Sequence, residues 1–244
     1  MESTVHAVSK ISGRSKLWLL LMLSTGFCSM IYELALAQLL TGLLGNALAR
    51  FATTLGVYVV GMGLGSVTFS SKDEARDGRT LFIAEIGLFI TGLVAPFIFV
   101  GAYRFALDAS SNADTQTWIV LVITHSVIFL TGLLSGLELP ILSAISNRDS
   151  GQGDSTVLTA DYVGMFLASI AFPFLLYPVI GLIPTFAIAT ALNLGAAALT
   201  FFLIGGKSSL VKILLVIFAA LNLVSFVFAS HIQTWLSNLY AVVS

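Results

Sequence analysis

Four carboxylates interrupt long apolar stretches of this sequence, where an acidic side chain is costly enough to require a physical reason. They are Glu33, Glu85, Glu138 and Asp161. Carboxylates in such places bind a cation, carry a proton or fix helix packing through polar contacts. The last three lie toward the ends of their stretches that we expect on the cytoplasmic side, so they are candidates for one site around a cationic ligand.

Position in a helix offers a second explanation for two of these three carboxylates. Glu85 and Asp161 come close to the start of their apolar stretches, where the helix dipole stabilises a negative charge. Glu138 has no such position, and Pro140 two residues later loosens the helix end. Glu138 is therefore the carboxylate that helix chemistry explains least.

Glu33 differs from the others because a basic residue follows it in the next apolar stretch. If the first two stretches form an antiparallel hairpin, Gln38 lies opposite Arg50, and Arg50 leans toward Glu33. We expect a buried polar clamp that fixes helix packing, with a substrate or proton site as the alternative. His125 stands alone in its stretch, which favours a hydrogen-bonded packing residue over a ligand.

Small residues four positions apart recur in two of the stretches. Gly61 and Gly65 form one pair, and Gly132 and Gly136 form the other. Such spacing is typical of helices whose backbones approach closely in a membrane. The first pair sits in a glycine-rich run without the strand that a dinucleotide site needs. We find no catalytic residue, no metal-ligand spacing and no cofactor motif, so none of these sites is predicted.

The elements that position these residues are membrane helices. A soluble domain carries about 25% charged residues, whereas this chain carries 9% and is 57% hydrophobic, with a mean hydropathy of +1.00. Because the stretches lack the alternation of a membrane barrel, the fold class is all-α, a polytopic helix bundle. Seven stretches qualify: 17–42, 47–70, 81–102, 117–145, 157–180, 184–205 and 209–230.

Charge distribution predicts how the bundle is oriented. Nine of the eleven Lys and Arg residues precede the first stretch or fall in alternating connections. The positive-inside rule then makes 1–16 a cytoplasmic tail and 17–230 the transmembrane domain. Residues 231–244 form a short interfacial tail that ends on the periplasmic side. We expect 103–116 to be the longest outer loop and 146–156 a flexible cytoplasmic one. A net charge of -1 argues against nucleic acid as a partner. The apolar stretches make the lipid bilayer the predicted partner.

Four blocks of the chain together resemble a known family. They are Tyr32-Glu33 with Gln38 and Gly61-x-Gly63-x-Gly65; Glu85; Ser135-Gly136-Leu137-Glu138-Leu139-Pro140; and Asp161-Tyr162-Val163-Gly164 with Phe172-Pro173-Phe174-Leu175-Leu176-Tyr177-Pro178. In this order they resemble the membrane portion of membrane-bound spermidine synthase-like proteins, the polyamine aminopropyltransferases.

The resemblance implies a membrane anchor or partner of a soluble aminopropyltransferase-type domain. In the fused family members that domain binds decarboxylated S-adenosylmethionine and a diamine, and we expect residues 1–244 to correspond to the membrane portion alone. We therefore expect a protein of the bacterial inner membrane that is not catalytic alone. Two alternatives stay open: a carrier of small solutes, polyamines or cations, and a non-catalytic accessory subunit of a larger membrane complex.

Overall fold

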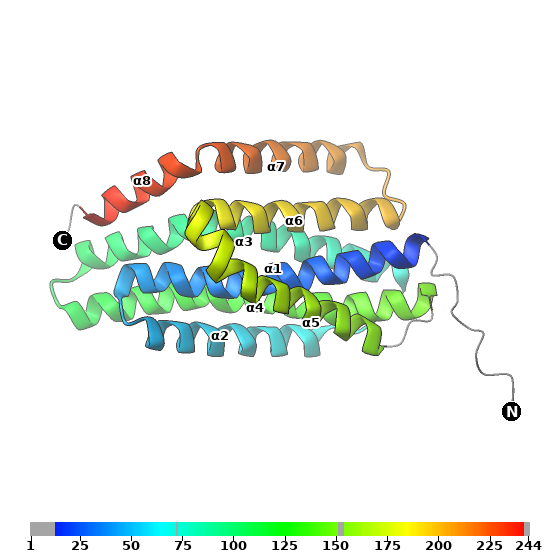
Figure 1. Ribbon diagram of the computed structural model, residues 1–244, viewed down its shortest axis with the longest axis horizontal. Helices are drawn as coiled ribbons and strands as arrows, with labels where there is room; N and C mark the ends of the chain where they lie inside the picture. Colours follow the sequence, from blue (N-terminus) through cyan, green and yellow to red (C-terminus); the bar gives the residue numbers. More distant parts are fainter. Residues whose placement is uncertain (1–12, 72, 151–153, 242–244) are drawn as a thin grey trace, which may run out of the picture.

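The computed structural model describes residues 13–71, 73–150 and 154–241, and these residues fold into a bundle of helices (Figure 1). The elements are α1 (Gly13–Leu44), α2 (Ala47–Thr68), α3 (Glu74–Ala109), α4 (Ala113–Ser150), α5 (Asp154–Ala171), the π-helix η1 (Phe172–Ile180), α6 (Leu182–Leu203), α7 (Ser209–Val227) and α8 (Ala229–Ala241). Within the described ranges, seven helices are long and apolar enough to cross a membrane, with α5 and η1 forming one span. The predicted fold class is confirmed.

Short polar turns connect the helices, and their side chains cap the helix ends. The α1–α2 turn is only Gly45 and Asn46, both in the left-handed backbone region, which glycine and asparagine tolerate. The Asn46 side chain accepts a hydrogen bond from the Ala49 amide at 3.4 Å. Asp73 caps α3 in the same way, accepting from the Arg76 amide at 2.8 Å. These turns keep consecutive helices antiparallel.

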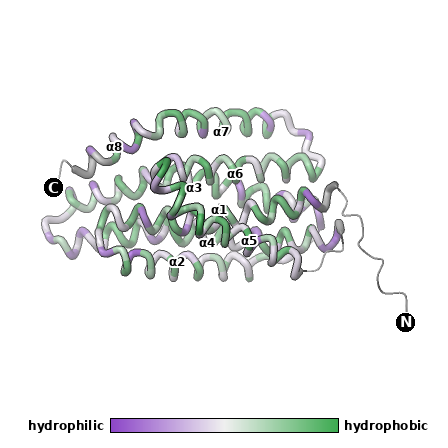
Figure 2. The backbone as a smooth tube through the Cα atoms, viewed as in Figure 1, coloured by the Kyte–Doolittle hydropathy of each residue, from purple (hydrophilic) through white to green (hydrophobic). Residues whose placement is uncertain are grey.

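The helices lie side by side with α2 and α7 at opposite edges, and α5 crosses the bundle obliquely (Figure 1). The closest pairs are α2 with α4, α3 with α4, α1 with α5, and α3 with α6. Hydrophobic residues predominate along the helices, including the outer helix α7 (Figure 2), and their side chains are apolar. Many of those on α2, α5 and α7 are exposed. Exposed apolar faces of this extent suit contact with lipid rather than water.

The predicted outer loop at 103–116 is wrong. Helix α3 continues to Ala109 and α4 begins at Ala113, so only residues 110–112 connect them. The Asn112 side chain starts α4 by accepting hydrogen bonds from the Asp114 and Thr115 amides at 2.9 and 3.1 Å. Outside the hydrocarbon layer a helix needs no apolar residues, so the polar sequence here does not mark a helix end.

The second predicted loop and both tails differ in part from expectation. Helix α4 runs to Ser150 and α5 starts at Asp154, which makes most of 146–156 helical; residues 151–153 lie outside the described ranges. Of the predicted tail 1–16, α1 already includes residues from Gly13 onward. The last segment forms α8, in which Leu236 is buried in the core and Trp235 lies against Phe97. Part of this segment thus packs on the bundle.

Candidate functional site

A small polar cavity lies where α1, α2, α4 and α5 meet. Its volume is about 70 Å³, and its lining residues are Ser29, Met62, Ser66, Ser135, Gly136, Glu138, Leu139 and Asp161. A single water needs only about 10–15 Å³ open to a water-sized sphere. The cavity therefore has room for a few waters or one small cationic group. It brings together two of the predicted carboxylates, Glu138 and Asp161.

Glu138 is a deeply buried carboxylate of this cavity, with 4% of its surface exposed. Its Oε2 atom accepts a hydrogen bond from Ser135 Oγ, one helical turn earlier, at 3.4 Å. Its Oε1 atom is buried and has no hydrogen-bond partner among the residues that the structure describes. Because an unsatisfied buried acceptor carries a desolvation penalty of about 1–3 kcal/mol, more for a charge, Oε1 calls for a ligand or a proton.

Asp161 reaches the cavity from α5 across the surface of α1. A Cβ atom at Gly26 would lie 2.6 Å from the Asp161 Oδ1 atom, so only glycine leaves space for this carboxylate. The same place on α5 is held close to α1 by Gly164, where an added Cβ would collide with the Leu23 carbonyl oxygen. The local sequence thus fixes the position of Asp161 through backbone contact.

A pair of hydroxyl groups forms the wall between α1 and α2. Ser29 Oγ and Tyr58 Oη lie 3.1 Å apart, and Tyr58 Oη also donates to the Ser29 carbonyl oxygen at 3.1 Å. Tyr58 is completely buried. These bonds orient Ser29 where it lines the cavity.

Glu85, the third carboxylate of the predicted group, does not line this cavity. It is fully buried, and its Oε2 atom accepts a hydrogen bond from Asn193 Nδ2 on α6 at 2.8 Å. The other oxygen atoms of this pair, Glu85 Oε1 and Asn193 Oδ1, have no hydrogen-bond partner within the described part of the chain. Glu85 and Asn193 therefore form a separate polar contact between α3 and α6.

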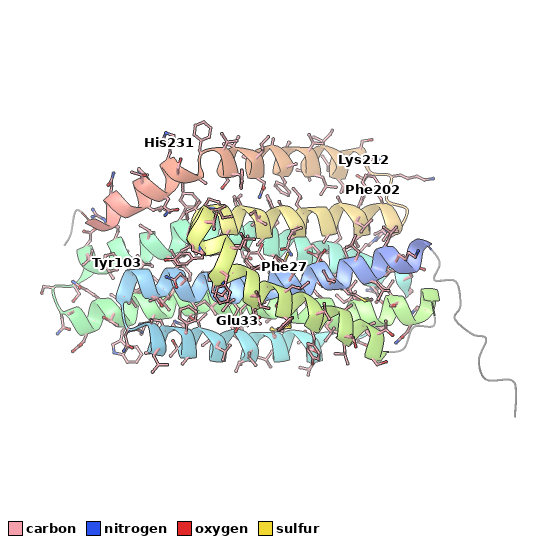
Figure 3. The ribbon with its side chains drawn as sticks, in the orientation of Figure 1. Phe27, Glu33, Tyr103, Phe202, Lys212 and His231 are labelled. Carbon is pink, nitrogen blue, oxygen red and sulfur yellow. The ribbon has the colours of Figure 1, made fainter. Side chains whose placement is uncertain are left out.

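The predicted clamp of Glu33, Gln38 and Arg50 is not formed in the described part of the chain. Glu33 is buried in the middle of the bundle (Figure 3). Gln38 Nε2 donates to the Tyr177 hydroxyl on η1 at 3.0 Å, and no ion pair joins Glu33 to Arg50 within the described ranges. The reason is packing: α2 lies chiefly along α4, so Arg50 faces that helix.

His125 lies on α4 within electrostatic range of Arg50. Its Nδ1 atom is 2.8 Å from the Leu121 carbonyl oxygen, one turn earlier on the same helix. The ring is thus engaged with its own helix. Among the residues that the structure describes, no three His, Cys, Asp or Glu side chains gather as metal ligands would.

The four predicted packing glycines lie at the contact of α2 with α4. An added Cβ at Gly61 would be 2.5 Å from the Phe129 carbonyl oxygen, and one at Gly65 would collide with the Leu133 carbonyl oxygen. Gly132 and Gly136 face Tyr58 and Met62 of α2 in the same way. At Gly63, between the first two, an added Cβ would meet no atom of another helix within 4 Å in the described part of the chain.

Several polar residues of these sites were not predicted from the sequence. They are Ser29, Tyr58, Ser66, Ser135 and Asn193. Serines in membrane helices commonly bond to their own backbone, so their presence carries little signal. An asparagine amid apolar residues is a clearer one, because its amide must find a partner in the membrane. Asn193 could have been predicted to pair with a buried carboxylate.

A larger groove of about 750 Å³ lies between α6 and α7. Its lining is mostly apolar, with Asn222 within it and Lys212 near one end (Figure 3). Asn222 already donates to the Ala187 carbonyl oxygen at 3.2 Å and to the Thr190 hydroxyl. The groove is lined by no carboxylate, so it is a weaker candidate for a polar binding site than the carboxylate cavity.

Curated relatives share one description. The chain is 32% identical over 177 residues to polyamine aminopropyltransferase 2 of Aquifex aeolicus, which is 72% of this chain and 34% of that protein. It is 34% identical over 172 residues to polyamine aminopropyltransferase of Leptospira interrogans (70% and 32%), and 31% identical over 178 residues to that of Mycobacterium tuberculosis (70% and 32%). The chain spans about a third of the length of these relatives.

No family model matches the chain, and no solved structure matches it. The relatives cover most of the helical bundle by length, at about 30% identity. Over the residues that the structure describes, the protein is therefore all-helical, with seven apolar helices that fit a multi-pass membrane protein, and it is related over about 70% of its length to proteins named polyamine aminopropyltransferase.

Proposed function

We propose that this chain is the membrane half of an aminopropyltransferase-type protein and anchors or partners the soluble domain that performs the transfer. The observation that supports this most is the pattern of coverage, in which 70–72% of this chain aligns with only 32–34% of each relative. In this proposal, the remaining two thirds of such proteins correspond to the soluble part. The membrane half holds that part at the bilayer and does not catalyse alone.

One end of the bundle offers a firm place for such a partner. Figure 1 shows the start of α1, the ends of α2 and α4 and the starts of α3 and α5 together at one end of the bundle. The Arg148 Nη1 atom on α4 lies 2.8 Å from Asp77 Oδ2 on α3, and Ser71 Oγ donates to the same carboxylate oxygen at 2.8 Å. These contacts tie two helix ends together, so a docked domain would rest on fixed elements.

The test is purification of the tagged chain from its native membranes in a mild detergent. We expect a soluble aminopropyltransferase to co-purify in stoichiometric amount, and the complex to bind an adenosyl cofactor and transfer an aminopropyl group. Arg148→Glu at the proposed docking end is expected to lower the recovery of the transferase. The matched control is Arg104→Glu, a charge reversal near the other end of α3.

The proposal fails on either of two results. One is a purified chain that carries no protein able to bind an adenosyl cofactor. The other is equal loss of the transferase with Arg148→Glu and Arg104→Glu, which would remove the docking end as the reason for association.

A further inference from the structure

We propose that the cavity between α1, α2, α4 and α5 binds one primary ammonium group, the end of an aliphatic amine, with Glu138 and Asp161 as its charged partners. That the cavity takes a cation follows from its own residues. The choice of an alkylammonium over an inorganic cation rests on the proposed function, since the relatives are named for polyamines.

The charge of the cavity selects a cation. Its lining contains two carboxylates and no Lys, Arg or His side chain. A carboxylate in a low-dielectric interior is stable only when it is paired, hydrogen-bonded or neutralised. Glu138 has one hydrogen bond, to Ser135, and its Oε1 atom has none. A monovalent cation would supply both the missing bond and the missing charge.

Hydrogen-bonding capacity matches an ammonium group. An –NH₃⁺ group donates three hydrogen bonds and accepts none. Glu138 on α4, Asp161 on α5 and Ser66 on α2 line the same space from three helices, and each carries an oxygen that can accept a hydrogen bond. Calcium takes six to eight oxygen ligands, and magnesium needs near-octahedral ligation. Since Ser29 Oγ and Ser135 Oγ already bond within the protein, the acceptors that remain suit an ammonium better.

The size and polarity of the cavity place the alkyl part of the ligand. A volume of about 70 Å³ admits the charged end of an amine but not a long chain. Ser66 is exposed and Asp161 is half-buried, whereas Glu138 is 4% exposed, so the cavity deepens from α2 and α5 toward α4. Met62 and Leu139 give the lining an apolar side for the first methylene groups. In this proposal, the rest of the ligand's alkyl chain extends outward past Ser66.

The binding test uses the purified full chain in detergent micelles and isothermal titration calorimetry. The probes are n-propylamine and 1,3-diaminopropane, with tetramethylammonium chloride as the cation without an N–H donor and sodium chloride as the inorganic one. We expect one site for each amine and none for tetramethylammonium. Glu138→Gln and Asp161→Asn should each weaken amine binding at least about tenfold, because each removes a charge-assisted hydrogen bond. Glu33→Gln, the same change at a buried carboxylate outside the cavity, should leave the affinity within about threefold.

A second pair of variants guards against misfolding of the carboxylate variants. Ser66→Trp blocks the outer part of the cavity from an exposed position, and Val67→Trp adds the same side chain at the neighbouring position, which is 77% exposed. We expect loss of amine binding with the first and normal binding with the second. Equal binding by both would overturn the proposal.

Three further results would also overturn it: no heat with either amine, unchanged amine binding in a folded Glu138→Gln protein, or sodium binding that depends on Glu138 while the amines do not bind. The assay needs no soluble partner, so it stands apart from the co-purification test. Amine binding without a co-purified transferase would refute only the proposed function. A co-purified transferase without amine binding would refute only this site.

Discussion

Substitution of Gly61 by alanine tests a close backbone contact between α2 and α4. Gly61 lies on α2 against α4, and an added Cβ would be 2.5 Å from the Phe129 carbonyl oxygen and 3.0 Å from the Leu133 amide nitrogen. Ordinary van der Waals contact begins near 3.4 Å. The two backbones would have to separate by about 0.9 Å, and neither neighbour is a side chain that could rotate away.

The cost follows from that separation. A gap of about 0.5–1 Å forfeits a quarter to a half of the dispersion energy of each affected atom pair, and overpacking typically costs about 1–3 kcal/mol. Alanine also favours the helix over glycine by up to about 1 kcal/mol, which offsets part of this loss. We therefore expect Gly61→Ala to lower the free energy of unfolding by about 1–2 kcal/mol.

Gly63→Ala is the matched control, because Gly63 lies two residues away on the same helix and its added Cβ would meet no atom of another described helix within 4 Å. It gains the same helix propensity without the collision, so the two variants should differ by about 2 kcal/mol. The assay is reversible unfolding in mixed micelles with increasing dodecyl sulfate, followed by tryptophan fluorescence. Trp118 and Trp235, which are exposed, are replaced by phenylalanine in all variants, so that the fully buried Trp18 is the reporter. Variants within about 0.5 kcal/mol of each other would refute a backbone contact at Gly61.

Two polar contacts give further stability predictions. Asn193→Leu should lower the free energy of unfolding by about 2–3 kcal/mol, measured in the same micelles, because the buried Glu85 loses its 2.8 Å hydrogen bond. Adding Glu85→Leu should restore much of the lost stability. No recovery in the double variant would count against the pairing of Glu85 with Asn193. Arg148→Gln should lower the free energy of unfolding by only about 1 kcal/mol, because Arg148 is 35% exposed in its ion pair with Asp77. High salt screens the pair, so the loss of stability should be smaller there. A loss that does not depend on salt would contradict an ion-pair origin.

Composition and apolar length predict the membrane helices well, but they do not predict where the helices end. Runs of about 20 apolar residues are set by the thickness of the hydrocarbon layer. A helix continues beyond that layer wherever its backbone can still hydrogen-bond, as α3 does to Ala109 and α4 does from Ala113. The polar residues at 103–116 report where the chain leaves the apolar region. The helix itself stops only at Ser110, and Asn112 begins the next one.

Sequence analysis could identify a residue of the candidate site where the position of a charged side chain in its own helix did not account for its presence in an apolar stretch. Glu138 met that condition, and it proves to be the more deeply buried of the two carboxylates in the cavity. The proposed clamp was not predictable, because adjacent helices in sequence need not face each other with their polar sides. Arg50 turns toward α4, where α2 makes its main contact, and Gln38 finds Tyr177, far along the chain. Pairing across helices depends on rotation about each helix axis, which apolar spacing alone leaves free when most faces are apolar.

Close packing and the carboxylate cavity are parts of one arrangement. Gly136 lies against the Met62 carbonyl oxygen and also lines the cavity, two residues before Glu138 on the same helix. On the other side, Gly26 makes room for Asp161, and Gly164 brings the same turn of α5 against α1. A shift of either helix pair would therefore move a carboxylate by a comparable distance. Two of the sequence blocks that carry the family resemblance contain both a close-packing glycine and a cavity carboxylate, Gly136 with Glu138 and Gly164 with Asp161. Such blocks describe a site together with the backbone contacts that hold it, which is what a binding site within a membrane bundle requires.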